Sequence, residues 1–136
     1  MTRKIALISG CFDGGPHVGH LYILGEIRKL APYTVVTLNS DAYLARKGPG
    51  RPLNAFEKRR AALYNTGLVD EVIAIEDSPL EVIKTLRPDY ICVGRNDYAL
   101  EQVVGYKECR EWGGQVVIIG KDLGVSTTQL VNAKLN

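Results

Sequence analysis

Long apolar runs, cysteine motifs and an excess of charge are all missing from this sequence of 136 residues. Its apolar runs reach about five residues, against the roughly 20 that span a bilayer, so no membrane-spanning helix is expected. Three widely spaced cysteines without a Cys-x-x-Cys pair argue against a disulfide framework or a zinc knuckle. A net charge of +2 and an aromatic content of 7% argue against nucleic-acid binding.

The composition instead suits one folded domain. Hydrophobic residues make up 46% of the chain, which is enough for a core and argues against disorder. We see no internal repeat, low-complexity tract or linker, and therefore expect a single domain over residues 1–136. No signal peptide of the charged-then-apolar type opens the sequence, so a cytoplasmic location is expected.

Short apolar runs alternate with helical patterns along the whole chain. Uniformly apolar runs favour a parallel sheet covered on both faces, and the alternation predicts a doubly wound, Rossmann-like α/β domain of about five strands. The expected strands are residues 5–8, 34–38, 71–75, 90–93 and 116–119. The expected helices are residues 19–30, 54–67, 79–86, 100–112 and 126–134.

Residues that start and stop helices support these assignments. Asn54 is expected to cap the second helix, with Glu57 completing a capping box. Ser78-Pro79 predicts the start of the third helix, and Arg87-Pro88 predicts its end. Further C-terminal stops are expected from the glycines that follow the second and fourth helices, Gly67 and Gly113-Gly114.

The most unusual stretch is Cys11-Phe12-Asp13-Gly14-Gly15-Pro16-His17-Val18-Gly19-His20, which holds both histidines of the chain. It lies between the first expected strand and the first expected helix. Glycines there let the backbone approach a ligand, and a helix N-terminus offers unpaired N–H groups. His17 and His20, three residues apart, share one face of the first turn. This geometry suits a polyphosphate and points to nucleotide chemistry.

The two histidines have other interpretations, which the residues alone leave open. They could bind a metal, but a zinc site needs further ligands and the chain has no third histidine. They could also be core residues. The loop is neither Gly-x-Gly-x-x-Gly nor a P-loop, which argues against a dinucleotide-dependent oxidoreductase and a P-loop enzyme.

Ligands of doubly wound sheets bind beyond the carboxyl ends of the strands. Four segments are expected there: residues 10–20, 39–51, 94–98 and 120–128. The second leads into the cationic, glycine-rich stretch Arg46-Lys47-Gly48-Pro49-Gly50-Arg51-Pro52, which either closes over phosphates or is a solvated turn. Ser126 and Thr127 in the fourth either hold phosphate oxygens or cap the last helix. Asp13 and Asp97 either bind a ligand hydroxyl or Mg²⁺, or cap a helix.

Together these stretches resemble the cytidylyltransferase-like nucleotidyltransferase family. His17-Val18-Gly19-His20 is similar to its His-x-Gly-His signature, and Gly124-Val125-Ser126-Thr127-Thr128 is similar to its second signature, of the Gly-Ile-Ser-Thr-Thr type. Within the family, the resemblance is closest to the adenylyltransferases that make ADP-heptose from heptose 1-phosphate. It covers nearly the whole chain, including Asn39-Ser40-Asp41 and Lys47-Gly48-Pro49-Gly50-Arg51-Pro52.

The resemblance implies an in-line displacement at the α-phosphorus of a nucleoside triphosphate, with pyrophosphate as the leaving group. His17 and His20 would donate to triphosphate oxygens, and Lys47 would neutralise the α-phosphate. Ser126 and Thr127 would hold the β- and γ-phosphates. Mg²⁺ would bridge the phosphates, as in other triphosphate sites.

The same resemblance implies a nucleoside triphosphate and a phosphorylated small-molecule acceptor as partners, no nucleic acid, no membrane, and a homodimer. Nucleotide contacts are expected from Gly10, Cys11, Phe12, His17, Gly19, His20, Gly94, Gly124, Val125, Ser126 and Thr127. Acceptor contacts are expected from Asp13, Asn39, Asp41, Lys47, Arg51, Arg59, Arg95 and Asp97.

Three positions depart from the family pattern. Gly14-Gly15-Pro16 places three residues between the aspartate and the first histidine, where the family has two. Gly94-Arg95-Asn96-Asp97-Tyr98 replaces a Lys-Gly-Gly-Asp-Tyr stretch, and Lys121 stands where cytidylyltransferases often have arginine.

We expect adenylyl transfer from ATP to a sugar phosphate. The alternatives are a CTP-dependent glycerol 3-phosphate cytidylyltransferase and a nucleotide-binding protein without turnover.

Overall fold

The computed structural model describes residues 3–94 and 99–120. A parallel sheet of five strands, in the order β3-β2-β1-β4-β5, forms its centre. This is the fold class that the alternating pattern predicts. The strands are β1 (Ile5–Gly10), β2 (Tyr33–Asn39), β3 (Glu71–Ile75), β4 (Tyr90–Val93) and β5 (Gln115–Ile118).

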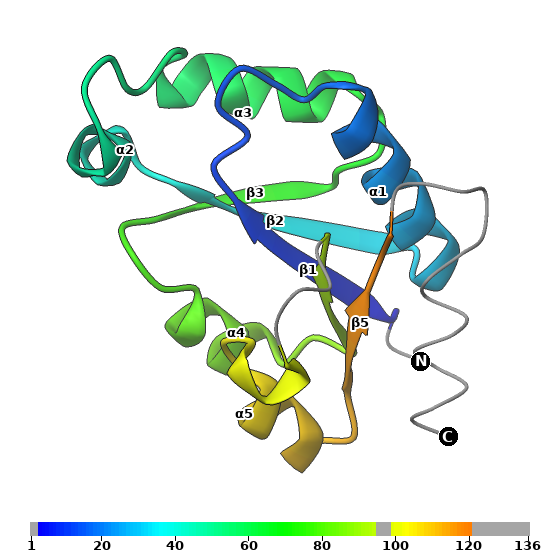
Figure 1. The fold of residues 1–136 in the computed structure, drawn as a ribbon. Coiled ribbons are helices and arrows are strands. Elements are labelled where there is room, and N and C mark those ends of the chain that lie inside the picture. The colour runs from blue at the N-terminus through cyan, green and yellow to red at the C-terminus, as the bar shows by residue number, and fades with distance from the viewer. Residues whose placement is uncertain (1–2, 95–98, 121–136) are drawn as a thin grey trace.

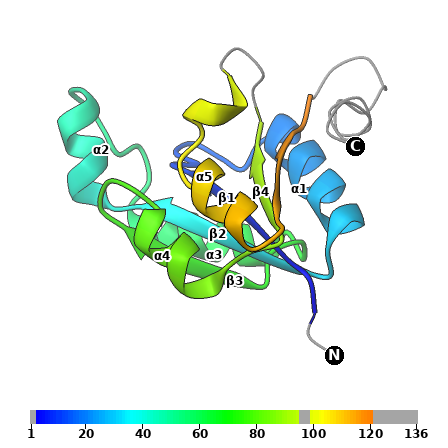
Figure 2. The same ribbon diagram turned by 90° about the horizontal axis from the view of Figure 1, so that it is seen from below.

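Helices cover both faces of the sheet (Figure 1). One face carries the two longest helices in the described residues, and the other carries two shorter helices and a 3-10 helix (Figure 2). The first layer consists of α1 (Val18–Leu30) and α3 (Phe56–Asn65), and the second of α4 (Leu80–Leu86), η1 (Leu100–Gln102) and α5 (Tyr106–Glu111). The remaining helix, α2 (Asp41–Lys47), lies beyond the carboxyl end of β2 (Figure 1).

The core has two parts, one on each face of the sheet. Along β1, Ala6 and Ile8 are buried in the cluster under α1 and α3, whereas Leu7 is buried in the cluster under α4 and α5. Successive side chains of a strand point to opposite faces, so a strand that is apolar at every position needs cover on both. The uniformly apolar runs of the sequence therefore reflect burial on two sides.

The strand predictions agree with the structure to within two residues at each end, and those for β3 and β4 match it. The expected stops are also confirmed. Arg87 adopts the left-handed conformation (φ 50°) at the end of α4, and Gly67 and Gly113 have φ of 76° and 84° after α3 and α5. The expected helix over residues 126–134 lies outside the described residues.

Four expectations about the helices are wrong. Asn54 does not cap α3: the N-cap is Ala55, without a side-chain bond, and the Phe56 N–H donates to Asp41 Oδ1 at 2.9 Å instead. The start expected at Ser78-Pro79 moves by one residue, because Pro79 is the N-cap of α4. The Ser78 hydroxyl still accepts from the Leu80 N–H at 3.2 Å.

The expected helix over residues 100–112 is divided into η1 and α5. The break lies at Gly105, whose φ is 89° and whose position lacks space for a Cβ, which would lie 2.9 Å from Ile83 Cδ1 and Ile91 Cδ1. The segment from residue 41 to 47, expected as part of a loop, is the helix α2. None of the helices within residues 3–94 and 99–120 has the length and hydropathy to cross a membrane.

Candidate active site

A cleft of about 330 Å³ opens at the carboxyl ends of β1 and β4, beside the start of α1. It lies at the switch point of the sheet, because β1 pairs with β2 on one side and with β4 on the other. The cleft is therefore where the sequence predicts a ligand. It is lined by Ile8, Ser9, Gly10, Cys11, Phe12, His17, Gly19, His20, Ile23, Val93 and Gly94.

The loop between β1 and α1 folds into a tight turn. The Gly15 N–H donates to the Phe12 carbonyl at 3.2 Å, and Gly14 takes a φ of 80°. Phe12 itself has a φ of 48°, a left-handed conformation that costs a non-glycine residue energy. Its ring folds back over Gly10, where a Cβ would lie 2.9 Å from the ring. The turn contains part of the longer Gly14-Gly15-Pro16 segment.

His17 and His20 form a reciprocal cap at the start of α1. His17 is the N-cap residue, and its Nδ1 accepts from the Gly19 N–H at 3.1 Å. His20 Nδ1 accepts from the His17 N–H at 3.2 Å. The two rings stack with centroids 3.8 Å apart, and the Phe12 ring lies 4.7 Å from that of His20. The expectation that the pair shares one face is confirmed.

These bonds fix the tautomer of both histidines. A backbone N–H is always a donor, so each Nδ1 must be an unprotonated acceptor in this geometry. The ring N–H of each histidine therefore lies at Nε2, on the far side of the ring from the cap. Both histidines line the cleft, and a ring N–H there is a hydrogen-bond donor suited to phosphate oxygens.

Helix α2 ends at the lysine that the family resemblance singles out. Ser40 caps the helix, because its hydroxyl accepts from the Tyr43 N–H at 3.1 Å. Lys47, the last residue of α2, is exposed, and its ammonium lies 4.8 Å from the centroid of the Tyr43 ring. A hydrogen bond with the Tyr43 side chain, and more weakly the charge of Cys11, raise the pKa of Lys47. Lys47 is therefore a cation at neutral pH.

Asp13, expected to contact the acceptor, has partners within the protein in this structure. Its carboxylate accepts from the N–H groups of Leu53 and Asn54, at 2.8 and 2.9 Å, and from Arg51 Nε at 3.3 Å. The side chain is 2% exposed. Burial acts to raise the pKa of Asp13, but these three donors together lower it. Asp13 thus binds the loop after α2 to the loop after β1, and Arg51 is its partner.

Arg59, also expected to contact the acceptor, has partners within the protein. Its side chain is fully buried, and its guanidinium donates four hydrogen bonds to groups within the protein. Nε donates to the Asn54 carbonyl at 2.9 Å, and Nη1 donates to the carbonyls of Cys11 and Asn39 at 2.9 and 2.8 Å. Nη2 donates to Asp41 Oδ1 at 2.8 Å. The expected role in acceptor binding gains no support from these contacts, because the sequence does not show that these acceptors surround the guanidinium.

The two polar residues after β2 have structural partners as well. Asn39 is buried, and its Oδ1 accepts from Cys11 Sγ at 3.5 Å. Asp41 bonds both Arg59 and the first N–H of α3, although its side chain is 48% exposed. Their assignment as direct acceptor ligands gains no support from these contacts.

Among the cysteines, Cys92 and Cys109 are buried, as expected of packing residues. Burial is the main cause that raises the pKa of both, that of Cys109 to about 11. Cys11 is half-buried and lines the cleft. The expected site residues Arg95, Asp97, Gly124, Val125, Ser126 and Thr127 lie outside the described residues.

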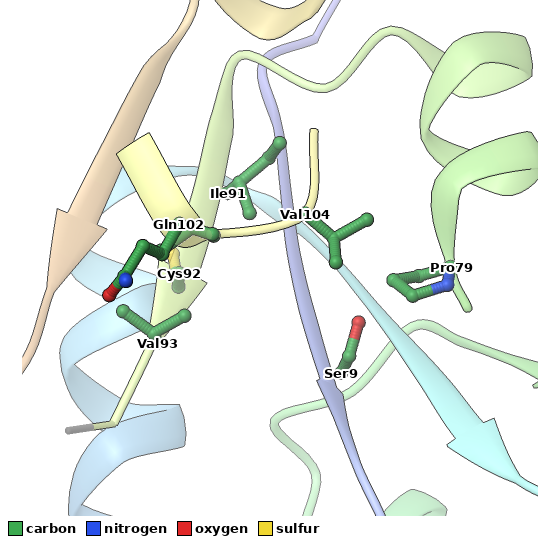
Figure 3. A pocket seen from close by; sticks show the side chains of 8 residues that line it. Ser9, Pro79, Ile91, Cys92, Val93, Gln102 and Val104 are labelled. Atoms are coloured by element: carbon green, nitrogen blue, oxygen red, sulfur yellow. The ribbon is translucent and has the colours of Figure 1, made fainter. Parts of the chain in front are cut away.

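A second cavity, of about 460 Å³, was not expected from the sequence. It is mainly apolar and includes Ser9 and Val93, which also line the first cleft, so the two are neighbours at this edge of the sheet. Figure 3 shows Val104, from the segment after η1, across from Ser9 of β1. The feature of the sequence that indicates this cavity is the apolar pair Val103-Val104. The other lining residues are Pro79, Ile91, Cys92 and Gln102.

Comparisons with known proteins identify relatives of this chain. Bifunctional protein HldE of Ectopseudomonas mendocina is 40% identical over 131 residues, covering 95% of this chain but 27% of that protein. Bifunctional protein HldE of Paramagnetospirillum magneticum is 41% identical over 136 residues, covering 98% and 27%. The chain thus spans only 27% of the length of either relative.

Among solved structures, a lipopolysaccharide core biosynthesis protein from Thermoplasma volcanium has a TM-score of 0.70. It is 23% identical, and the match covers 89% of this chain and 98% of that one, which establishes the shared fold. Pantothenate synthetase from Thermus thermophilus matches with a TM-score of 0.54 at 20% identity, over 86% and 55% of the chains. The cytidylyltransferase-like family profile matches residues 7–132, which include the cleft and its histidine pair, and the chain belongs to this family.

Proposed function

We propose that this chain is a nucleotidyltransferase that moves an adenylyl group from ATP to a sugar phosphate of the heptose 1-phosphate type. The observation that carries the proposal is the stacked, reciprocally capped pair of His17 and His20, which lines the cleft at the switch point of the sheet. Support for the acceptor class comes from the resemblance to the heptose phosphate adenylyltransferases, which the HldE relatives share over this segment.

In the proposed reaction, an oxygen of the acceptor phosphate attacks the α-phosphorus of ATP. A new P–O bond forms, the bond from the α-phosphorus to the bridging oxygen breaks, and its electron pair leaves with pyrophosphate. The attacking oxygen is already anionic at neutral pH, so the step needs no general base. The protein contributes position and charge stabilisation.

The proposal divides this work among residues of several segments. His17 and His20 donate from Nε2 to triphosphate oxygens and stabilise the charge that develops on them. Lys47, a cation at the end of α2, neutralises the α-phosphate from the β2 side of the sheet. Ser126 and Thr127 hold the β- and γ-phosphates, and Arg95 holds the acceptor.

Mg²⁺ is the proposed cofactor, and when bound it neutralises the triphosphate. The described residues contain no group of three or more His, Cys, Asp or Glu side chains placed to hold a metal ion. The ion prefers oxygen ligands, and the triphosphate supplies them. The ion therefore fits as a complex with the triphosphate, with the protein holding the phosphates.

A homodimer and a cytoplasmic location complete the proposal, both by analogy with the family. Two other functions are tested against it. One is cytidylyl transfer from CTP to glycerol 3-phosphate. The other is nucleotide binding without turnover, for which the intact set of His17, His20 and Lys47 would have no use.

Pyrophosphate release from purified protein with Mg²⁺ tests these functions together. ATP and CTP are each combined with heptose 1-phosphate and with glycerol 3-phosphate. Turnover with ATP and the sugar phosphate supports the proposal, and turnover with CTP and glycerol 3-phosphate replaces it by the first alternative. Nucleotide binding without turnover in any combination contradicts the proposed acceptors and favours the second alternative.

A further inference from the structure

Arg59 stands out as a buried cation that the proposed reaction does not use directly. It is the middle residue of Lys58-Arg59-Arg60, and its two neighbours are exposed. A buried arginine is stable only when its donors are satisfied, and Arg59 bonds three carbonyls and one carboxylate. Its partners Cys11, Asn39 and Asp41 belong to two separate segments at the carboxyl edge of the sheet.

One of these bonds acts on the loop that carries the histidines. Arg59 holds the carbonyl of Cys11, and two residues later the Asp13 carboxylate holds the N–H groups of Leu53 and Asn54. Phe12 lies between these two anchors in its left-handed conformation, with its ring 4.7 Å from that of His20. The bonds on both sides of Phe12 fix the strained residue against which His20 packs.

A second hydrogen bond of Arg59 holds the start of α2, the helix that ends at Lys47. Asp41 is the first residue of α2, and its carboxylate accepts from both Arg59 Nη2 and the first N–H of α3. The Asn39 carbonyl just before it is held by the same guanidinium. Arg59 thus bonds the histidine loop and the start of α2 at once, although 28 residues separate Cys11 from Asn39.

We propose that Arg59 is a positioning residue for nucleotidyl transfer, which sets the location of the histidine pair relative to Lys47. This inference rests on the proposed function. Lysine cannot replace arginine here, because one ammonium cannot reach carbonyls and a carboxylate that lie around a planar fork. Arg59→Lys keeps the charge and removes the geometry.

A double-mutant cycle between Arg59 and Lys47 separates this role from a purely structural one. Arg59→Lys is expected to lower kcat by on the order of 10- to 100-fold while the KM for ATP changes little, because alignment is lost in the transition state. In the Lys47→Ala background the same substitution is expected to cost about threefold or less, because the group that it misaligns is gone. Arg60→Lys, at the exposed neighbouring position, is the control and should leave kcat unchanged.

Thermal unfolding of each variant establishes that the assays use folded protein. Should Arg59→Lys fail to fold, Asp41→Asn takes its place in the cycle, since it keeps a hydrogen-bond acceptor and removes the charge that Arg59 pairs with. Equal losses in both backgrounds, or an unchanged kcat in folded Arg59→Lys, would overturn the positioning role. Absence of turnover in the wild type contradicts the proposed function instead, so the two failures are distinguishable.

Discussion

The imidazole rings of His17 and His20 stack 3.8 Å apart with an interplanar angle of 21°, and each Nδ1 accepts a backbone N–H of the same turn. His17 and His20 therefore both line the cleft and cap the start of α1. A substitution at either position has two effects, one on the stability of α1 and one on the chemistry, and the two can be measured apart.

His17→Ala is expected to lower turnover by on the order of 10²-fold, by analogy with the loss of an oxyanion donor. It should also cost about 1 kcal/mol of stability, because the N-cap acceptor for the Gly19 N–H is lost. His17→Asn is the matched variant: asparagine is a good N-cap but ends short of Nε2. We expect it to restore the melting temperature and not the turnover. Near-normal pyrophosphate release by folded His17→Asn would remove His17 from the mechanism.

Gly15→Ala is expected to disturb the histidine pair. An added Cβ would lie 2.8 Å from His20 Nδ1 and 3.1 Å from the His17 backbone nitrogen, the two atoms of one hydrogen bond. Turnover should fall by about tenfold or more, since small displacements of catalytic groups are costly. Gly25→Ala is the control, because its Cβ meets nothing within 4 Å in the middle of α1. That substitution should raise stability by about 0.5–1 kcal/mol and leave turnover unchanged.

Acid is expected to destabilise the protein through Asp13. Its pKa in the folded state lies below the ordinary value of 3.8. A carboxylate with a lowered pKa contributes stability above the unfolded pKa and loses it as the pH falls through the folded pKa. The contribution is therefore complete at neutral pH and is lost below about pH 4. Urea unfolding between pH 3 and 7 should show a weaker pH dependence in Asp13→Asn, and parallel curves for the two proteins would contradict this account.

Thiol reagents are expected to distinguish Cys11 from the other two cysteines. Cys92 and Cys109 are buried and their pKa values are raised by burial, so neither presents a reactive thiolate at pH 8. An aromatic disulfide reagent should titrate one thiol in the native protein and three after denaturation. Cys11→Ser should abolish the native reaction, and ATP should slow it. Two fast thiols in the native Cys11→Ser variant would show that the buried cysteines are accessible.

The sheet and the location of the cleft follow from local patterns in the sequence. Apolar runs such as 5–8 are long enough for a strand and too short for a helix, and glycine and histidine after the first run mark the switch point. The left-handed stops at Arg87 and Gly67 are equally local, because a proline or a glycine acts on its immediate neighbours. For these elements, the residues that determine the structure are adjacent in the sequence.

The roles of Asp13, Asp41 and Arg59 depend on residues that are distant in the sequence. Arg59 bonds Cys11 across 48 positions, and Asp41 caps a helix that starts 15 positions later. In the sequence, Arg59 looks like a surface charge because it lies between two other basic residues. Asn54 looks like a helix cap, but in the fold Asp41 accepts the first N–H of α3 instead. Helix α2 is missed for a simpler reason: it is seven residues long and runs into a glycine-rich segment.

Burial on both faces of β1 also fixes the register of this strand against its neighbours in the sheet. A slip of one residue would move Leu7 into the core under α1 and α3, and would move Ile8 into the core under α4 and α5. The same slip would shift Cys11 and the following turn by about 3.3 Å, more than the hydrogen bonds of the histidine cap tolerate. Substitutions at Ala6 or Leu7 that alter this register should therefore inactivate the protein without changing a residue of the cleft.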